Sequence, residues 1–525
     1  MEATPQQLDA LFPHPGNVDI PNTAAKRVPG PVRQAGWTDE STQQARELLK
    51  DNHRRWHIFF NDKHFHNHAS HHLLAIYAMG ADSELLKAAY ETHVVYQKPA
   101  FPPPEDKKID TIIDDSNWKD HLGDERYYQA YLAFWTAKLV DKSISITSVL
   151  EKYVFSKDAN VVPGKTKDAP MMLSRFLGGF LHPLIHCGYG VEFSLPGLIA
   201  EGIAQATGQR VEAAAAFPET LFEASKLTGL GSHLANLVIS AKPAGSRLDA
   251  LTILARVSHD PAFAADKIGL PAPDDADENS IGRVIRVAGK RLLTYAEEWT
   301  SILTGDHVTT EFLSGKYEEV VWMNTVIYAT GGWAGRNQGE DKNKAFNADF
   351  FLMHLVTSAV FLPSFLNTLS PHSASVLLKT YFTISLVLYV ARGRPALPIS
   401  SFYANTSANP TPPTSSSASL PAKDTLTPHR AAPNPWLPII QTTLVHPNEH
   451  LCKLQRALWH FADVYGGSPK GRFVDATEGG GAIGLGELDG TLFVRAAGLT
   501  ADRMRWMKEG QEQGDWDRGG FFKKE

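Results

Sequence analysis

Apolar residues recur every three or four positions through most of the chain, the spacing of a helix with one buried face. Helices are predicted at residues 38–49, 82–94, 117–139, 143–155, 171–187, 196–206, 218–227, 247–257, 280–303, 311–328, 344–369, 373–391 and 436–465. Thr38 and Asp82 stand where a side chain can cap a first turn, and Pro196 and Pro218 suit the first helical position. The pattern predicts an all-α fold, a multi-helix globular bundle.

Strand-like alternation is almost absent, apart from a short pair near residues 490–494. Gly331 and Gly332 are expected to end the helix before them. The most apolar helix, 373–391, contains Lys379 and Thr380. It is too polar for a confident membrane span, so we expect it to be a buried core helix.

Composition divides the chain into four parts. Residues 1–37 form an extended lead-in, 38–404 a helical catalytic core, 405–435 a low-complexity insertion, and 436–525 a C-terminal helical part of the same core. The insertion is rich in Ser, Thr, Pro and Ala. It has too few apolar residues to offset the entropy of ordering, so it is predicted to be disordered.

The length, composition, net charge and cysteine count of the chain exclude several classes of protein. The chain has 525 residues, 43% of them hydrophobic, and a net charge of −6. These values fit a globular protein and argue against nucleic acid as the main partner. Cys187 and Cys452 are the two cysteines, so no disulfide framework is expected. Without a signal-peptide pattern at the start, a cytoplasmic protein with no membrane partner is expected.

Histidines are concentrated in residues 64–72, where five occur among nine residues. Neutral imidazole is the commonest metal ligand. His68 and His72 are four positions apart and would share a helical face, although a capping or solvated role is about as probable for this stretch alone. His182 and His186 repeat the spacing in an apolar segment and favour metal more strongly. Pro183 loosens that argument, because it places His182 at a helix start.

Three further groups could complete a site. His354 lies in an apolar segment, where a lone histidine is more often a satisfied core residue, and Asp349 could orient an imidazole. Lys379 must extend to water or pair, or else it points into the site as a neutral amine or, carbamylated, as an oxygen ligand. His446 and His450 rank below the others, because Pro447 would turn His446 away from His450.

Motifs of other enzyme classes are missing. The glycine-rich stretches at residues 331–335 and 479–486 do not lie between a strand and a helix, as a dinucleotide fingerprint requires. There is no Gly-x-Ser-x-Gly elbow and no phosphate-binding loop ending in Lys-Ser or Lys-Thr.

With these residues in view, the chain resembles the questin oxidase-like family of fungal secondary metabolism. The segments that carry the resemblance are 67–74, 181–190, 349–354, 391–395, 446–451 and 487–491. The resemblance implies an oxygenase that opens the quinone ring of an anthraquinone-type polyketide to a benzophenone by Baeyer–Villiger-type oxidation. It implies NADPH as reductant and no flavin, in agreement with the absent flavin motif.

Taken together, the histidines and the resemblance suggest Fe(II), because imidazole suits iron and zinc, and zinc has no redox chemistry. The expected arrangement is a helical bundle around a buried histidine-rich site that binds dioxygen and an aromatic polyketide. The expected metal ligands are His68, His182, His186, His354 and Lys379, with His72 as the alternative to His68; Lys379 and His72 are the expected catalytic residues. Alternatives are a zinc hydrolase or lyase at the same histidines and a non-catalytic scaffold.

Overall fold

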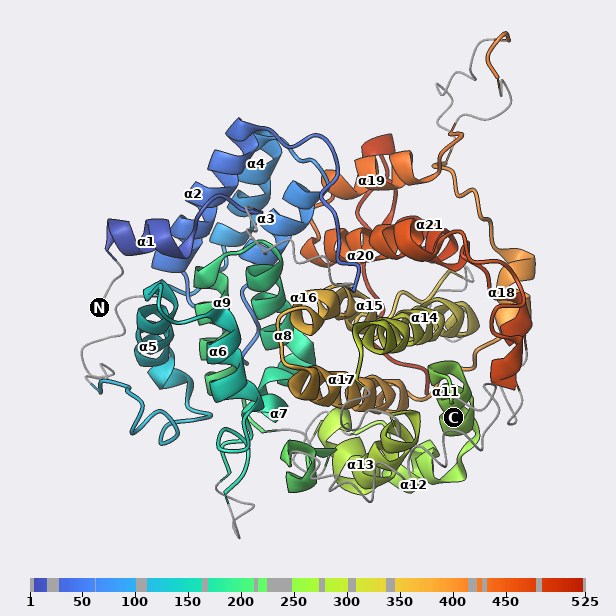
Figure 1. Ribbon diagram of the computed structural model, residues 1–525. Helices are drawn as coiled ribbons and strands as arrows, with labels where there is room; N and C mark the ends of the chain where they lie inside the picture. Colours follow the sequence, from blue (N-terminus) through green and yellow to red (C-terminus); the bar gives the residue numbers. More distant parts are fainter. Residues whose placement is uncertain are drawn as a thin grey trace.

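The computed structural model confirms the all-α prediction (Figure 1). It describes residues 4–16, 28–61, 63–100, 111–162, 169–211, 216–223, 248–272, 279–300, 308–336, 345–413, 423–426, 432–477 and 484–522. Within these ranges the extended pairings are isolated bridges and no strand is formed.

The helices divide into an N-terminal and a C-terminal group, which lie on the left and the right of Figure 1. The first group contains α1 (Pro5–Leu11), α2 (Asp39–Arg55), α3 (Ala69–Ala78), α4 (Ser83–Val94), α5 (Tyr128–Val140), α6 (Ile146–Leu150), α7 (Met172–Phe176), α8 (Gly178–Glu192) and α9 (Pro196–Gly208). The second contains α11 (Ala250–His259), α12 (Ala265–Ile268), α13 (Ser280–Trp299), α14 (Thr310–Gly335), α15 (Met353–Ala359), α16 (Leu362–Leu366), α17 (Pro371–Ala391), α18 (Ile399–Asn405), α19 (Trp436–Leu444), α20 (Glu449–Tyr465) and α21 (Leu492–Met504).

Four central helices join the two groups. α3 packs against α20, α20 against α15, α15 against α8, and α8 against α3, which closes a ring of contacts. α9 lies along α8 on the side of the N-terminal group. The four histidines of the candidate site described below lie in these helices or directly before them.

Local sequence signals account for several helix starts. The Thr38 hydroxyl accepts a hydrogen bond from the Ser41 N–H at 3.1 Å, and the Asp82 carboxylate accepts one from the Leu85 N–H at 2.9 Å. Both caps were predicted. By its length and composition alone, the apolar α17 could cross a membrane. However, 94% of its most apolar 18-residue stretch is buried within the protein. It packs on the amphipathic α13, as expected of a core helix.

Several predicted boundaries are wrong. Residues 117–127 form turns and one short 3₁₀ helix, and α5 begins only at Tyr128. Gly331 and Gly332 lie inside α14, where Phe346 and the Asn347 carbonyl pack so closely against Gly332 that they leave no room for a side chain. The 436–465 segment is two helices, 490–494 opens α21 instead of a hairpin, and the lead-in contains α1.

Other predictions are met only in part or lie outside the described residues. Residues 345–352 precede α15 without forming a helix, and residues 143–155 form α6 followed by one π-helical turn. A 3₁₀ helix at Glu219–Phe222 is the described part of the predicted 218–227 helix. Residues 478–483 and much of the 405–435 insertion lie outside the described ranges.

Candidate metal centre

Four buried imidazoles meet where four helices begin. His68 precedes α3 as its cap residue, and His354 and His450 lie in the first turns of α15 and α20. His182 opens the regular part of α8. The four side chains come from four segments that are far apart in the sequence. Each of these residues is at most 7% exposed.

A kink in α8 aims His182 into this space. Gly179, Phe180 and Leu181 have φ values of 54°, 55° and 68°, in the left-handed region. Such a run is strained for Phe and Leu and persists only where its surroundings impose it. The result is a hydrogen bond from His182 Nδ1 to the Gly179 carbonyl at 2.5 Å.

The groups that lie next to each Nδ1 atom indicate which ring nitrogen carries the proton. His182 Nδ1 bonds to a carbonyl, and His68 Nδ1 lies 3.4 Å from a carboxylate oxygen of Glu449. The carbonyl requires an N–H on His182 Nδ1 and so leaves a lone pair on its Nε2, and the Glu449 carboxylate favours the same tautomer for His68. These two Nε2 atoms are 2.8 Å apart. The contact is a hydrogen bond when His68 carries its proton on Nε2, and when the proton is on Nδ1 both Nε2 lone pairs are available to one cation.

The other two rings follow the same rule. His354 Nδ1 bonds to the Phe350 carbonyl at 2.8 Å, and His450 Nδ1 lies 3.1 Å from Glu449. Their Nε2 atoms are buried without a hydrogen-bond partner among the described residues. The ligand atoms of His68, His182 and His450 all lie within 4.8 Å of one another. Ligands bound at about 2.1 Å and at right angles are about 3 Å apart, so this donor set fits a divalent transition metal.

Burial keeps these rings neutral. It lowers the pKa of His68, His182 and His354 well below the ordinary value, and the pKa of His450 to about 4. Glu449 is the nearest charge: burial raises its pKa, but His450 and His68 more than offset this and hold the carboxylate ionised. A carboxylate that orients two imidazoles through Nδ1 is the usual second layer of a metal site.

Lys453, one turn after Glu449 on α20, is the lysine near these rings. Its ammonium is buried, and Nζ has no hydrogen-bond partner in the part of the chain described. Burial lowers the pKa of Lys453 to about 8, and its charge lowers the pKa of His68 and His450 in turn. Lys379, the lysine predicted to serve the site, lies elsewhere: it is only partly buried on α17, near Glu297 of α13.

The structure separates His186 and His72 from the four converging rings. His186 uses both nitrogens, Nε2 with Glu201 at 2.7 Å and Nδ1 with His71 at 3.0 Å, and so offers no lone pair to a metal in this arrangement. His72 Nδ1 bonds to His93 Nε2 at 3.0 Å. Spacing alone could not show these partners.

Two other expected roles also change. Asp349 does not orient an imidazole, since it pairs with Arg392 at 2.7 Å and caps the turn that leads into α15. The Phe350 carbonyl orients His354 instead. His446 does turn away from His450, as predicted, and bonds to the Met504 carbonyl. His450 was nevertheless ranked too low, although the Glu449 beside it was a usable signal in the sequence.

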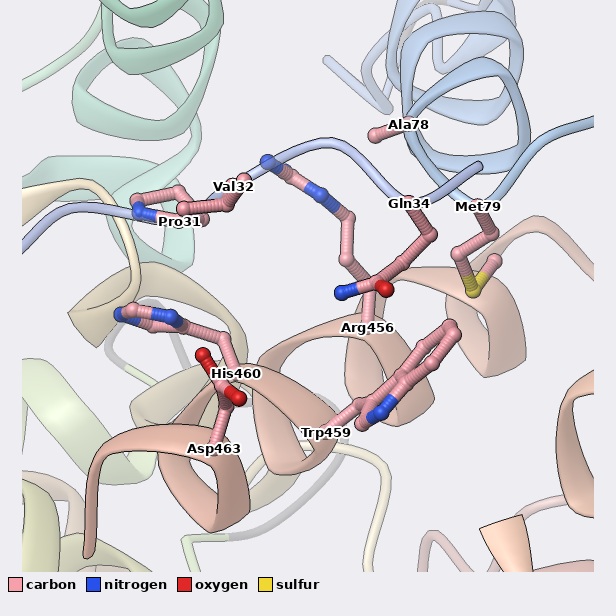
Figure 2. A pocket seen from close by; sticks show the side chains of 9 residues that line it. All are labelled: Pro31, Val32, Gln34, Ala78, Met79, Arg456, Trp459, His460 and Asp463. Carbon is pink, nitrogen blue, oxygen red and sulfur yellow. The ribbon is translucent and has the colours of Figure 1, made fainter. Parts of the chain in front are cut away.

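A separate pocket lies further along α20 (Figure 2). Arg456, Trp459, His460 and Asp463 of α20 line it, together with the end of α3 and the segment around Pro31. Arg456 is paired with Glu192. The four converging imidazoles are not among the lining residues, so this pocket does not open directly onto them.

Fold and site together define a helical protein with a buried polyhistidine centre shared by its two halves. The questin oxidase-like family model matches residues 65–458, a span that includes all four imidazoles, and the chain belongs to this family.

Individual relatives agree with this assignment. A Baeyer–Villiger oxidase of Pestalotiopsis microspora is 29% identical over 349 residues, which cover 65% of this chain and 69% of that protein. An oxidoreductase of Aspergillus parasiticus is 26% identical over 449 residues, 85% of this chain and 77% of that protein. The questin oxidase of Aspergillus terreus is 25% identical over 420 residues, 79% of each chain. The chain is therefore an oxidoreductase.

Proposed function

We propose that the protein is a cytoplasmic oxygenase that opens the quinone ring of an anthraquinone-type polyketide by Baeyer–Villiger-type oxygen insertion, at a non-haem iron centre. The observation that carries the proposal is the close approach of the Nε2 atoms of His68 and His182, which lie 2.8 Å apart on two buried rings. The names of the relatives, Baeyer–Villiger oxidase and questin oxidase, support the reaction class.

His68, His182 and His450 would hold the metal, with His354 as the fourth ligand. Fe(II) bound there would supply the redox chemistry that activates dioxygen, which zinc cannot supply. Glu449 keeps two of these rings in the required tautomer. Lys453 would fill the role expected of Lys379: it would offer a neutral amine or, as a carbamate, an oxygen ligand to a centre otherwise made of neutral imidazoles.

The protein would also bind and orient an aromatic substrate. The Phe350 ring lies 5.2 Å from His354 and 4.8 Å from His450, centroid to centroid, and Phe180 lies 6.1 Å from His354. Aromatic side chains of this kind stack with planar ligands and exclude water. Insertion of one oxygen atom from dioxygen requires two electrons for the second atom, and NADPH is the source that the family resemblance suggests.

Elemental analysis combined with an anaerobic assay tests this function. The purified protein should contain about one iron per chain, and turnover of an anthraquinone should stop without dioxygen. A zinc hydrolase or lyase at the same histidines would continue to work anaerobically. A non-catalytic scaffold would retain no metal after dialysis.

A further inference from the structure

A second group of buried polar side chains lies beside the metal centre and is not explained by it. His53 of α2, Glu201 of α9, His186 of α8 and His71 of α3 form one continuous chain of hydrogen bonds. The distances are 2.5 Å from His53 Nδ1 to Glu201, 2.7 Å from Glu201 to His186 Nε2, and 3.0 Å from His186 Nδ1 to His71 Nε2. None of the four side chains is more than 7% exposed.

Close packing of α8 and α9 builds this chain. Gly202 follows Glu201, and a Cβ at this position would lie 2.8 Å from the backbone nitrogen of Cys187. The two helices can approach only because residue 202 lacks a side chain. The approach places Glu201 next to His186, which is the neighbour of Cys187 in α8.

The carboxylate at the chain's centre sets the direction of the hydrogen bonds. Burial raises the pKa of Glu201, but hydrogen bonds from His186 and His53 lower it to about 2, so it only accepts. A neutral His186 that donates from Nε2 to Glu201 accepts at Nδ1. His71 must then donate from Nε2, which leaves its Nδ1 as an acceptor.

That last acceptor has no partner. His71 is fully buried, and its Nδ1 makes no hydrogen bond to any residue in the described ranges. An unpaired buried acceptor is costly and calls for an explanation, such as a catalytic role or a bound water, ion or ligand. The His71 ring stacks on Tyr189, 5.2 Å between centroids with an interplanar angle of 22°, and lies 5.6 Å from the His68 ring. The His71 ring therefore lies against an aromatic side chain and beside the metal centre.

We infer that His71 Nδ1 accepts a hydrogen bond from a hydroxyl group of the aromatic substrate, and that Glu201, through His186, holds His71 in the accepting tautomer. His71 is then a substrate-binding residue, and His186 and Glu201 are positioning residues. The inference rests on the proposed function for the class of substrate, a hydroxylated anthraquinone. It adds a requirement that the ring system carry a free hydroxyl.

Equilibrium binding to the metal-loaded protein without dioxygen tests the inference, using the absorbance of the quinone. The probes are 2-hydroxyanthraquinone and 2-methoxyanthraquinone. The wild type should bind the hydroxy compound roughly 10- to 100-fold more tightly, the value of one buried hydrogen bond. In Glu201→Gln the amide can donate to His186, which reverses the chain and makes His71 Nδ1 a donor. The preference should then largely disappear while the metal content stays at the wild-type level.

Glu192→Gln is the matched control, because the Glu192 side chain is also largely shielded, at 9% exposed, but pairs with Arg456. It should keep the wild-type preference for the hydroxy compound. Equal affinities of the two compounds for the wild type, or the same ratio in Glu201→Gln, would overturn the inference; a water molecule on His71 gives this result. Because the assay measures binding and not turnover, failure of the proposed reaction is detected separately, by the iron analysis and the oxygen assay.

Discussion

Two groups of buried histidines lie side by side, and they differ in what each ring's second nitrogen contacts. In the metal centre, His182 and His354 each donate a hydrogen bond from Nδ1 to a backbone carbonyl. The Nδ1 atoms of His68 and His450 lie next to the Glu449 carboxylate. Their Nε2 atoms face a common space. In the neighbouring chain, His186 is bonded on both sides. The comparison shows that the partner of the second nitrogen, and not the number of histidines, decides whether a group can bind metal.

Loss of a centre ring should have the largest effect. His450→Ala removes a lone pair from the centre, so iron content and turnover should both fall to background. His446→Ala, four positions away, is the matched control: it loses a hydrogen bond to the Met504 carbonyl, should cost about 1–2 kcal/mol of stability, and should keep its iron. Metal analysis and an activity assay on both proteins check this. Full iron in His450→Ala would remove it from the ligand set.

The two lysines provide the next test. Lys453→Met should lower turnover roughly 10- to 100-fold, as loss of a group beside a metal usually does, whereas Lys379→Met should change turnover less than about twofold. If Lys453 acts as a carbamate, the activity of the wild type should also fall when carbon dioxide and bicarbonate are removed and return when they are restored. The reverse ranking of the two variants would favour Lys379 as the lysine of the site.

Substitution of His186 tests directly whether this residue belongs to the metal centre or to the neighbouring chain of hydrogen bonds. A ligand at this position would make His186→Asn metal-free, as the sequence spacing alone predicts. The hydrogen bonds to Glu201 and His71 predict instead full iron content at saturating metal, with turnover reduced roughly 10- to 100-fold. Iron content measured beside His182→Asn, which should be metal-free, separates the two interpretations.

The smallest effect is expected for His72→Gln, on how the stability of the metal-free protein changes in acid. Burial lowers the pKa of His72 to about 3, so the folded protein keeps this ring neutral while the unfolded chain takes up a proton below about pH 6.5. The neutral ring therefore contributes fully to the free energy of unfolding above that pH. This contribution is lost as the pH falls, by about 1.4 kcal/mol per pH unit for each such histidine. Thermal unfolding of the wild type and His72→Gln between pH 8 and 5 measures it, and the variant should show the smaller slope.

Glu201 adds a second and separate pH window. Its pKa, lowered to about 2 against an ordinary value near 4.5, contributes stability above pH 4.5 that is lost as the pH falls toward 2. Glu201→Gln should therefore flatten the stability curve below pH 4.5 and leave the slope between pH 5 and 8 unchanged. A change in the upper window would mean that Glu201 also controls the protonation of the histidines.

The sequence by itself determined the helices, the burial of α17 and the family. Apolar spacing and caps such as Thr38 and Asp82 act within one or two turns, so they can be recognised locally. Local sequence also marked His68, His182 and His354, which the structure brings together. The continuation of α14 through Gly331, which packs against the distant Pro395, and the start of α5 at Tyr128 could not be recognised from local sequence.

Only the tertiary structure decided which nitrogens face one another. Spacing of four residues places His182 and His186 on one helical face, but α9 supplies Glu201 to the second ring and a left-handed kink supplies a carbonyl to the first. In the same way, a buried lysine can be recognised from sequence, but its direction cannot. Lys379 turns toward α13 and Lys453 toward the imidazoles because of how their helices pack, which no local pattern encodes.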